Sequence, residues 1–345
     1  MKPTSGGPRR LRVGKLPADL LARCLAKIPR ADSRVIVWPK IGEDAAVVEA
    51  GGALLVAKTD PVTFATDLIG WYAVHINAND VACMGATPLW FMADLLLPEG
   101  ATSDQAGSIF DQMLQACGSL GISLIGGHTE ITYGLERPIV AGCLLGEVTR
   151  ARLVTSSGAQ PGDDLVLTKG IAVEGTALLA REASAALTER RVGEALIKRA
   201  THFLFDPGIS VVADAKVACS VAHVTSMHDP TEGGLATGLE EVAAAAGVGF
   251  RIEQERIPVL EECRIICSAL GLDPLGLLAS GCLIATVPSE QSDALVRALS
   301  EARIAATVIG RVVPGEQGIT LCGPDGERPL PHFERDEVAR HFDSP

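Results

Sequence analysis

Predicted strands and helices alternate along the whole chain, which indicates an α+β or mixed α/β protein. The chain has 345 residues, more than one hydrophobic core usually organises. Apolar residues make up 47% and charged residues 21% of the sequence, which is typical of a globular protein. The segment 155–163 is rich in turn formers, so we expect two domains, over 1–155 and 156–345.

In the first half, two helices are expected between strands. Helical periodicity covers 67–84 and ends at Gly85, and it covers 103–120 and ends at Gly121. Expected strands cover 52–58, 122–125 and 138–145.

The second half restarts with a strand over 164–168 and a helix from about Val173. Further helices are expected near 209–220, 235–246, 259–270 and 289–301, and further strands near 249–253, 282–287 and 307–312. The sequence contains no convincing repeat.

Charge and hydropathy argue against nucleic-acid and membrane partners. The 30 basic and 42 acidic residues give a net charge of −12, which repels phosphate-rich surfaces. Residues 1–7 lack the apolar run of a signal peptide, and no stretch has the roughly 18 apolar residues of a membrane span. We therefore expect a cytoplasmic protein.

The nine cysteines are an odd number and are scattered through apolar segments, so we expect reduced core thiols. Cys263 and Cys267 are four residues apart on an expected helix. Metal binding is the alternative there, but no second pair or nearby histidine completes a site.

Acidic residues occur at element ends in the first half. Asp44 precedes an expected strand, Asp60 follows one, and Asp80, beside Asn79, lies in a helix with no other carboxylate over 71–86. Carboxylate and amide oxygens suit magnesium bridged to phosphates. Turn formation is the alternative for Asp44 and Asp60, and a hydrogen-bonded buried acid is the alternative for Asp80.

Two glycine pairs indicate close approach of a ligand to the backbone. Gly126 and Gly127 follow an expected strand, and successive N–H groups there can hold an anion. His128 and Glu130 resemble the H-x-E of zinc deaminases, but the sequence has no P-C-x-x-C to complete that site. A hydrogen-bonded loop histidine is the alternative for His128.

The segment 227–235 has the pattern of a helix start, with Asp229 as N-cap, Pro230 at the first position and Glu232 at the third. Capping does not explain Gly233 and Gly234, each of which costs about 1 kcal/mol inside a helix. A helix N-terminus favours phosphate, so these glycines indicate an anion site. The sequence contains no G-x-x-x-x-G-K-[ST] motif and no G-x-G-x-x-G after a strand, so a nucleotide would bind through acids and a metal.

Taken in order, these segments resemble the AIR-synthase (PurM-like) superfamily, which includes aminoimidazole ribonucleotide synthetase, selenophosphate synthetase, thiamine-monophosphate kinase and the hydrogenase maturation factor HypE. The similar segments are 14–17, 42–46, 59–60, 79–88, 126–129 and 229–236. The segments 257–258 and 270–274 are similar to HypE in particular. The resemblance covers nearly the whole chain, and its ordered set of motifs is more specific than any single one.

The resemblance implies a homodimer in which the N-terminal sheet pairs with its copy, with ATP near that interface. It implies Mg²⁺ on Asp44, Asp60 and Asp80, and it matches Lys15 to a lysine of a mobile N-terminal segment. The candidate nucleotide-binding residues are Asp44, Asp60, Asn79, Asp80, Gly126, Gly127, His128, Thr129, Asp229, Glu232, Gly233 and Gly234. The candidate catalytic residues are Asp80, Lys15 and Ser280.

The activity implied by the resemblance is ATP-dependent phosphoryl transfer, or dehydration through an activated carbonyl or amide oxygen. Such chemistry needs mainly positioning and charge neutralisation. The acceptor is an unknown small molecule or a protein-borne group, and a metalloenzyme maturation partner fits the HypE likeness. Two alternatives stay open: a homodimeric ATP-binding scaffold or accessory factor without catalysis, and a metabolite kinase of the thiamine-monophosphate kinase type.

The sequence departs from the HypE pattern at two places. HypE ends in Pro-Arg-Ile-Cys, whereas this sequence runs to Pro345 with no cysteine after Cys322. HypE also has Asn-Glu-Gly where this chain has Ala279-Ser280-Gly281, and a serine cannot act as the same carboxylate base. We therefore expect no self-carbamoyl dehydration, and the role of Ser280 is open.

Overall fold

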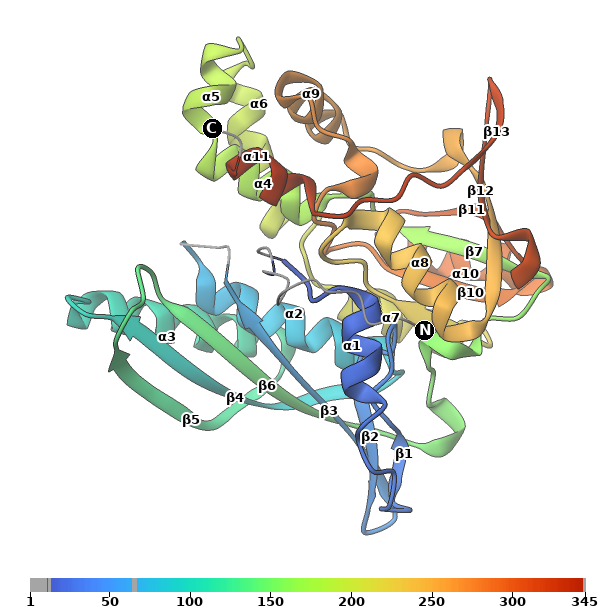
Figure 1. Cartoon of the computed structure of the whole chain (residues 1–345), viewed down its shortest axis with the longest axis horizontal. Helices are drawn as coiled ribbons and strands as arrows, with labels where there is room; N and C mark the ends of the chain where they lie inside the picture. Colours follow the sequence, from blue (N-terminus) through green and yellow to red (C-terminus); the bar gives the residue numbers. More distant parts are fainter. Residues whose placement is uncertain (1–10, 12–13, 64–66, 344–345) are drawn as a thin grey trace, which may run out of the picture.

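The computed structural model describes residues 11, 14–63 and 67–343. Residues 1–7, which the sequence analysis excludes as a signal peptide, lie outside the described ranges. The described chain forms two β-sheets, each with its own helices, and so has the expected two-domain mixed α/β architecture (Figure 1).

The N-terminal domain is built on a six-stranded sheet in which only β4 and β5 pair in parallel. In spatial order its strands are β1 (Val35–Val37), β2 (Ala46–Ala50), β3 (Ala53–Val62), β6 (Ile139–Val148), β4 (Thr87–Pro98) and β5 (Ser123–Thr132). Its helices are α1 (Ala18–Leu25), α2 (Ile69–Cys83) and α3 (Ser103–Leu120).

The C-terminal domain is built on a seven-stranded sheet. In spatial order its strands are β13 (Gly326–Pro329), β12 (Ile319–Gly323), β9 (Val248–Glu253), β11 (Ala306–Pro314), β7 (Asp163–Thr168), β10 (Ile284–Pro288) and β8 (Ser226–His228). Its helices are α4 (Val173–Glu182), α5 (Ser184–Glu189), α6 (Glu194–Thr201), α7 (Val212–Val221), α8 (Gly234–Ala246), α9 (Glu261–Leu270), α10 (Ser292–Glu301) and α11 (Glu337–Phe342).

Short 3₁₀ turns join these elements. They are η1 (Arg150–Arg152), η2 (Ser156–Gly158), η3 (His202–Leu204), η4 (Gln254–Arg256), η5 (Pro274–Gly276), η6 (Ser289–Gln291) and η7 (Gly315–Gln317). In the sequence, η1 and η2 lie between β6 of the first sheet and β7 of the second, and the expected boundary between residues 155 and 156 falls in the same interval.

Helices α2 and α3 confirm the sequence prediction closely, because strong local signals mark their ends. Thr102 caps α3 by accepting a hydrogen bond from the backbone of Gln105, and Gly121 ends the helix with φ at 70°. After α2, Gly85 has φ at 71°, and a Cβ there would lie 2.2 Å from the carbonyl oxygen of Arg152. Only glycine fits such a position.

The two domains share part of one hydrophobic core. Val173 and Ala177 at the start of α4, together with Phe203 and Ile209, pack into the core of the N-terminal domain. Figure 1 shows α2 between the N-terminal sheet and the C-terminal domain. A helix covered on two sides must be apolar nearly all round, which explains why α2 carries so little charge.

Two strands are longer than the sequence predicts. The expected strand over 52–58 continues to Val62, so Asp60 lies within β3 and not beyond its end. The expected strand over 122–125 continues to Thr132, so Gly126 to Thr129 are strand residues and not a loop after a strand. Pairing along the whole of β4 extends β5, and local sequence does not reveal that pairing. Helices α5 and α6 were not predicted.

Candidate active site

Aspartates from separate parts of the chain converge beside Lys58. The Nζ atom of Lys58 lies 3.2 Å from Oδ2 of Asp60 and 3.3 Å from Oδ2 of Asp80. Asp44 and Asp229 are close enough that their charges also raise the pKa of Asp80. The site therefore combines residues of the N-terminal sheet, α2 and the C-terminal domain.

Strand geometry explains why Lys58 meets these acids. Lys58 and Asp60 are two residues apart on β3, so their side chains leave the same face of the sheet. Burial lowers the pKa of Lys58, but Asp80, Asp60 and Asp44 together raise it above 10.5, so the amine stays charged. Burial raises the pKa of Asp80, and Lys58 opposes that shift. Lys58 was not predicted as a site residue, although the period of two on this strand places it on the same face as Asp60.

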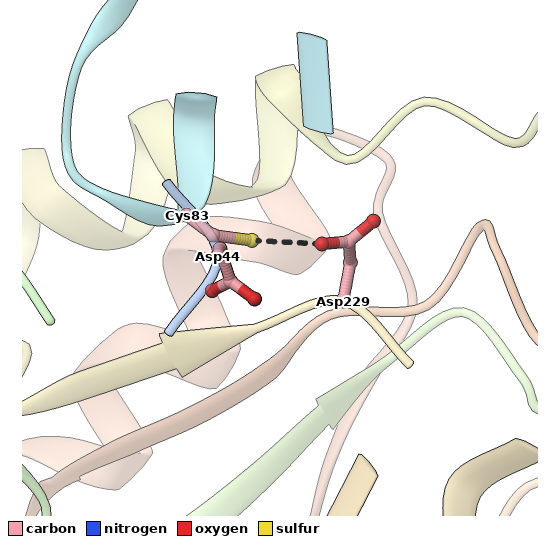
Figure 2. A group of neighbouring side chains, drawn as sticks. All are labelled: Asp44, Cys83 and Asp229. Carbon is pink, nitrogen blue, oxygen red and sulfur yellow. Dashed lines mark hydrogen bonds between the residues drawn. The ribbon is translucent and has the colours of Figure 1, made fainter. Parts of the chain in front are cut away.

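Asp44, Cys83 and Asp229 form a second, fully buried group (Figure 2). The thiol of Cys83 points toward Asp229, with Sγ 3.6 Å from Oδ1, and the ligand atoms of all three residues lie within 4.8 Å of one another. Burial raises the pKa of the Cys83 thiol, so it remains a protonated donor. Burial also raises the pKa of Asp229 to about 7.

Asp44 and Asp229 fit a divalent cation. Oδ2 of Asp229 is buried and has no hydrogen-bond partner among the described residues. Carboxylate oxygens are the ligands that Mg²⁺ prefers, whereas a thiol suits softer metals. The sequence predicts that Asp60 and Asp80 join Asp44 as ligands. In the structure Asp229 approaches Asp44, while Lys58 lies between Asp60 and Asp80.

A line of alternating charges leads away from Asp44. His228 donates through Nδ1 to Oδ1 of Asp44 (2.5 Å) and through Nε2 to Oε2 of Glu241 (3.0 Å). Lys15 donates to Oε1 of Glu241 (3.1 Å), and the Ser156 hydroxyl donates to Oδ2 of Asp44 (3.1 Å). This network connects the N-terminal segment and both domains.

Each charged group in this network favours the ionised form of its neighbours. Burial lowers the pKa of His228, but Asp44 and Glu241 raise it well above 6.5, so the imidazole is protonated at neutral pH. Burial raises the pKa of Glu241, yet His228 and Lys15 lower it to about 2. Burial lowers the pKa of Lys15, and Glu241 more than offsets this. His228 and Glu241 were not predicted, although His228 directly precedes Asp229.

A cavity of about 860 Å³ opens beside this network, with Lys15, Glu232, Gly233 and Asp336 in its walls. Burial raises the pKa of Glu232, and Lys15 partly opposes the shift. The cavity connects the N-terminal segment to the start of α8, where the sequence analysis places an anion site.

The start of α8 differs from the prediction. The helix begins at Gly234, and its N-cap is Gly233, not Asp229. Both glycines have positive φ, 81° and 68°, so Asp229 and Glu232 precede the helix in a separate turn. A Cβ on Gly234 would lie 2.4 Å from the carbonyl oxygen of Leu275, so the chain's own backbone explains this glycine.

The anion at this turn is a side chain of the same protein. Asp336 accepts a hydrogen bond from the backbone N–H of Gly233 at 2.7 Å. Its carboxylate also accepts from the backbone N–H of Val338 at 2.7 Å, although burial raises its pKa to about 6. A carboxylate of the same chain thus binds the N–H of Gly233 in this structure, and the anion site at this turn stays a prediction.

Asn79 does not join the acidic cluster. Its Nδ2 donates to the carbonyl oxygen of Ile209, and its Oδ1 accepts from the N–H of Val211, both at 2.8 Å. Both polar atoms of the Asn79 amide thus bind backbone groups of the C-terminal domain, so this side chain ties α2 to that domain and is not directed at the acidic cluster expected to hold the nucleotide.

Gly126 to Thr129 also lie apart from the cluster. Strand pairing connects Asp60 to Gly142, Gly142 to Ala93, and Ala93 to Gly127. Three strand spacings correspond to roughly 14 Å. His128 is exposed, and its Nε2 lies 3.3 Å from Oε2 of Glu130. These residues therefore do not reach the same chain's acids.

Comparison with known proteins places the chain in a family. Residues 42–148 match the family model for the N-terminal domain of AIR synthase related proteins, and residues 160–322 match the model for the C-terminal domain. The carbamoyl dehydratase HypE of Rhizobium leguminosarum bv. viciae is 33% identical over 288 residues, covering 80% of this chain and 78% of that relative. The chain belongs to the AIR synthase related family.

Other AIR synthase related proteins are similar over most of the chain. The HypE of Cupriavidus necator is 33% identical over 76% of this chain and 74% of its own length. A crystal structure of HypE in complex with ATP has a TM-score of 0.71 at 26% identity, covering 86% of this chain and 89% of that one. A thiamine-monophosphate kinase from Aquifex aeolicus shares the fold, with a TM-score of 0.67 at 21% identity over 90% of this chain and 97% of that one.

Across the described ranges, none of the helices combines the length and the apolar composition that crossing a bilayer requires.

Proposed function

We propose that this protein is an ATP- and Mg²⁺-dependent enzyme that phosphorylates a carbonyl or amide oxygen of a small acceptor. The observation that carries the proposal is the convergence of Asp44, Asp60, Asp80 and Asp229 at the domain junction. Burial raises the pKa values of Asp80 and Asp229, and such perturbed acids are typical of an active site. The relatives that act as carbamoyl dehydratases and the HypE structure solved with ATP support this chemistry.

Asp44 and Asp229 are the residues that would hold the metal. The metal neutralises charge on the transferred phosphoryl group when bound. Lys58 keeps Asp60 and Asp80 together by offsetting their repulsion, and Lys15 places a second amine at the cavity. These residues position the phosphates and do not form a covalent intermediate.

A homodimer would give a role to Gly126 to Thr129, which lie apart from the acidic cluster of their own chain. β5 is an edge strand of the N-terminal sheet, and it is long and exposed, with Ile125 at 53% and Ile131 at 58% exposure. Such an edge is a template for pairing with another chain. In our proposal Gly126 to Thr129 contact the nucleotide of the partner subunit.

The direct test is ADP release by purified protein supplied with Mg²⁺ and ATP. We expect turnover that a chelator abolishes and that Asp80→Asn lowers roughly 10- to 100-fold, because Asp80 orients the charges around the site. Asp104→Asn, which changes an exposed acid in the first turn of α3, is the matched control and should leave turnover unchanged.

Other outcomes would favour the alternative functions. Tight Mg-ATP binding without ADP formation would indicate a homodimeric scaffold. ADP formation only when an alcohol is supplied, with transfer to its hydroxyl group, would indicate a metabolite kinase like the structural neighbour from Aquifex aeolicus. Equal rates for Asp80→Asn and the wild type would contradict a catalytic role for the acidic cluster.

A further inference from the structure

The acidic group at the domain junction contains a thiol that Mg²⁺ does not need. Cys83 is the last residue of α2 and is 0% exposed, beside Asp44 at 5% and Asp229 at 1%. Mg²⁺ takes oxygen ligands in near-octahedral geometry, whereas a thiol is a ligand for softer ions. The proposed function therefore gives a role to the two aspartates and leaves Cys83 without one.

Three separate segments of the chain bring these groups together. Asp44 precedes β2, Cys83 ends α2, and Asp229 follows β8. The thiol points toward Asp229, and one ligand atom of each residue lies within 4.8 Å of the other two (Figure 2). The group therefore combines two oxygen ligands and one sulfur ligand around one point.

The spacing of sulfur and oxygen matches one edge of a tetrahedral zinc site. A Zn–S bond of about 2.3 Å and a Zn–O bond of about 2.0 Å, joined at a tetrahedral angle, place the two ligand atoms about 3.5 Å apart. Sγ of Cys83 and Oδ1 of Asp229 are 3.6 Å apart. With Asp44 as the third ligand, a tetrahedral ion keeps its fourth position open. A thiol–carboxylate hydrogen bond has the same length and is the alternative to a metal ligand.

Neighbouring side chains hold Asp44 in place for an ion. His228 donates to its Oδ1 at 2.5 Å, and the Ser156 hydroxyl donates to its Oδ2 at 3.1 Å. Such outer hydrogen bonds orient ligating carboxylates, and the second lone pair of each oxygen stays available to a metal. Oδ2 of Asp229 has no partner in the described part of the chain, so this carboxylate can turn without breaking a hydrogen bond at that atom.

The surrounding charges allow a third anionic ligand. Two carboxylates and a thiolate carry one negative charge more than a divalent ion neutralises. Burial and Asp44 raise the pKa of Asp229, and the positive charges of His228 and Lys58 oppose that shift. These two cations supply the compensating charge that a buried anionic site requires.

We propose that Asp44, Cys83 and Asp229 bind one Zn²⁺ ion, and that the Cys83 sulfur makes this site prefer Zn²⁺ to Mg²⁺. The inference rests on the metal site of the proposed function and names the ion that this site selects, but it does not require the proposed activity. On binding, a Zn–S bond forms, the S–H bond breaks, and the proton passes to the buffer without any change of oxidation state.

The experiment uses Co²⁺ as a spectroscopic probe of the zinc site in the full-length protein, after a chelator has removed bound metal. We expect a thiolate-to-cobalt charge-transfer band in the near ultraviolet and visible bands typical of tetrahedral coordination. Stoichiometric Zn²⁺ should abolish these bands, and an excess of Mg²⁺ should leave them unchanged.

Cys83→Ser replaces the sulfur with an oxygen and changes little else. It should abolish the charge-transfer band and weaken Zn²⁺ binding roughly 100-fold, because loss of outer hydrogen bonds alone costs about 10- to 100-fold. Mg²⁺ binding should stay unchanged. The matched control is Cys117→Ser, which alters a buried cysteine of α3 and should keep both the band and the affinity.

X-ray absorption at the zinc edge tests the wild type without any substitution. The spectrum should contain a sulfur neighbour at about 2.3 Å together with oxygen neighbours at about 2.0 Å. A shell of oxygen alone would overturn the inference, whether or not Cys83→Ser folds.

Other results would also decide against a zinc site. If the wild type shows no charge-transfer band, or if the band persists in Cys83→Ser, the thiol is a hydrogen-bonded core group. Equal affinities for Zn²⁺ and Mg²⁺ would likewise overturn the inference. Failure of the proposed function appears separately, as no ADP formation from Mg-ATP, and leaves these spectra unchanged.

Discussion

The His228 imidazole shows at the residue scale how buried charges at the junction depend on one another. It lies between Asp44 and Glu241, and its side chain is 7% exposed. Removing it leaves two carboxylates without their shared partner, which costs far more than the pair contributes when intact. A protonated imidazole at this position therefore stabilises the junction.

We expect His228→Asn to lower the free energy of unfolding by roughly 3–5 kcal/mol at pH 6. Because the folded pKa of His228 is raised, its stabilisation is complete below the unfolded pKa of about 6.5 and is lost as pH rises through the folded pKa. Urea denaturation of both proteins at pH 6 and at alkaline pH should show the difference shrinking. His332→Asn, which removes an exposed imidazole 3.0 Å from Glu240, should cost less than about 1 kcal/mol. A pH-independent difference would contradict a charged His228.

At the element scale, one stripe of α2 joins the domains. Trp71, His75, Asn79 and Cys83 follow one another at intervals of four residues, so they share one face of the helix. The ring of Trp71 lies 5.1 Å from that of Phe205, and Cys83 lies beside Asp229 as described above. Trp71, Asn79 and Cys83 on this stripe each contact the C-terminal domain, while Asn77 on another face binds the backbone of Asp60 in the sheet.

Asn79→Ala tests the stripe. It leaves the carbonyl of Ile209 and the N–H of Val211 unsatisfied, and each buried group without a partner costs about 1–3 kcal/mol. Hydrogen exchange should become faster around Val211, and the free energy of unfolding should fall. Gln160→Ala, which removes one exposed amide contact to Gly158, is the control. Unchanged exchange near Val211 would show that the amide does not hold the domains together.

At the scale of the whole molecule, the exposed β5 edge is the feature that a monomer does not explain. Long edge strands with apolar side chains are uncommon on monomeric proteins because they promote association. The exposed side chains of Phe110 and Leu114 on α3 add to the apolar surface of the same domain. Pairing of β5 with its copy would cover this edge.

We expect sedimentation to show a dimer for the wild type and a monomer for Ile131→Lys, because a buried, unpaired lysine at the edge opposes association. Val221→Lys changes a similarly exposed apolar residue on α7, at 45% exposure, and should remain dimeric. If Ile131→Lys remained a dimer, the interface would lie on another surface.

The sequence alone determined the two-domain architecture and most of the elements, because helix periodicity, caps such as Thr102 and glycines such as Gly85 and Gly121 are local signals. It also identified Asp44, Asp60 and Asp80 as unusual, since each places a carboxylate in an apolar context, and it interpreted Asp229 as a helix cap. Resemblance to a family added the nucleotide and the metal.

Only the tertiary structure decided which of these residues meet. Lys58, His228 and Glu241 join the site through ion pairs between distant segments. Asn79 does not join it, because its amide binds two backbone groups of the other domain. Cys83 meets Asp44 and Asp229 only when α2 packs against the C-terminal domain. The reason is physical: the pKa and the hydrogen bonding of a side chain depend on its neighbours in space, which local sequence does not specify.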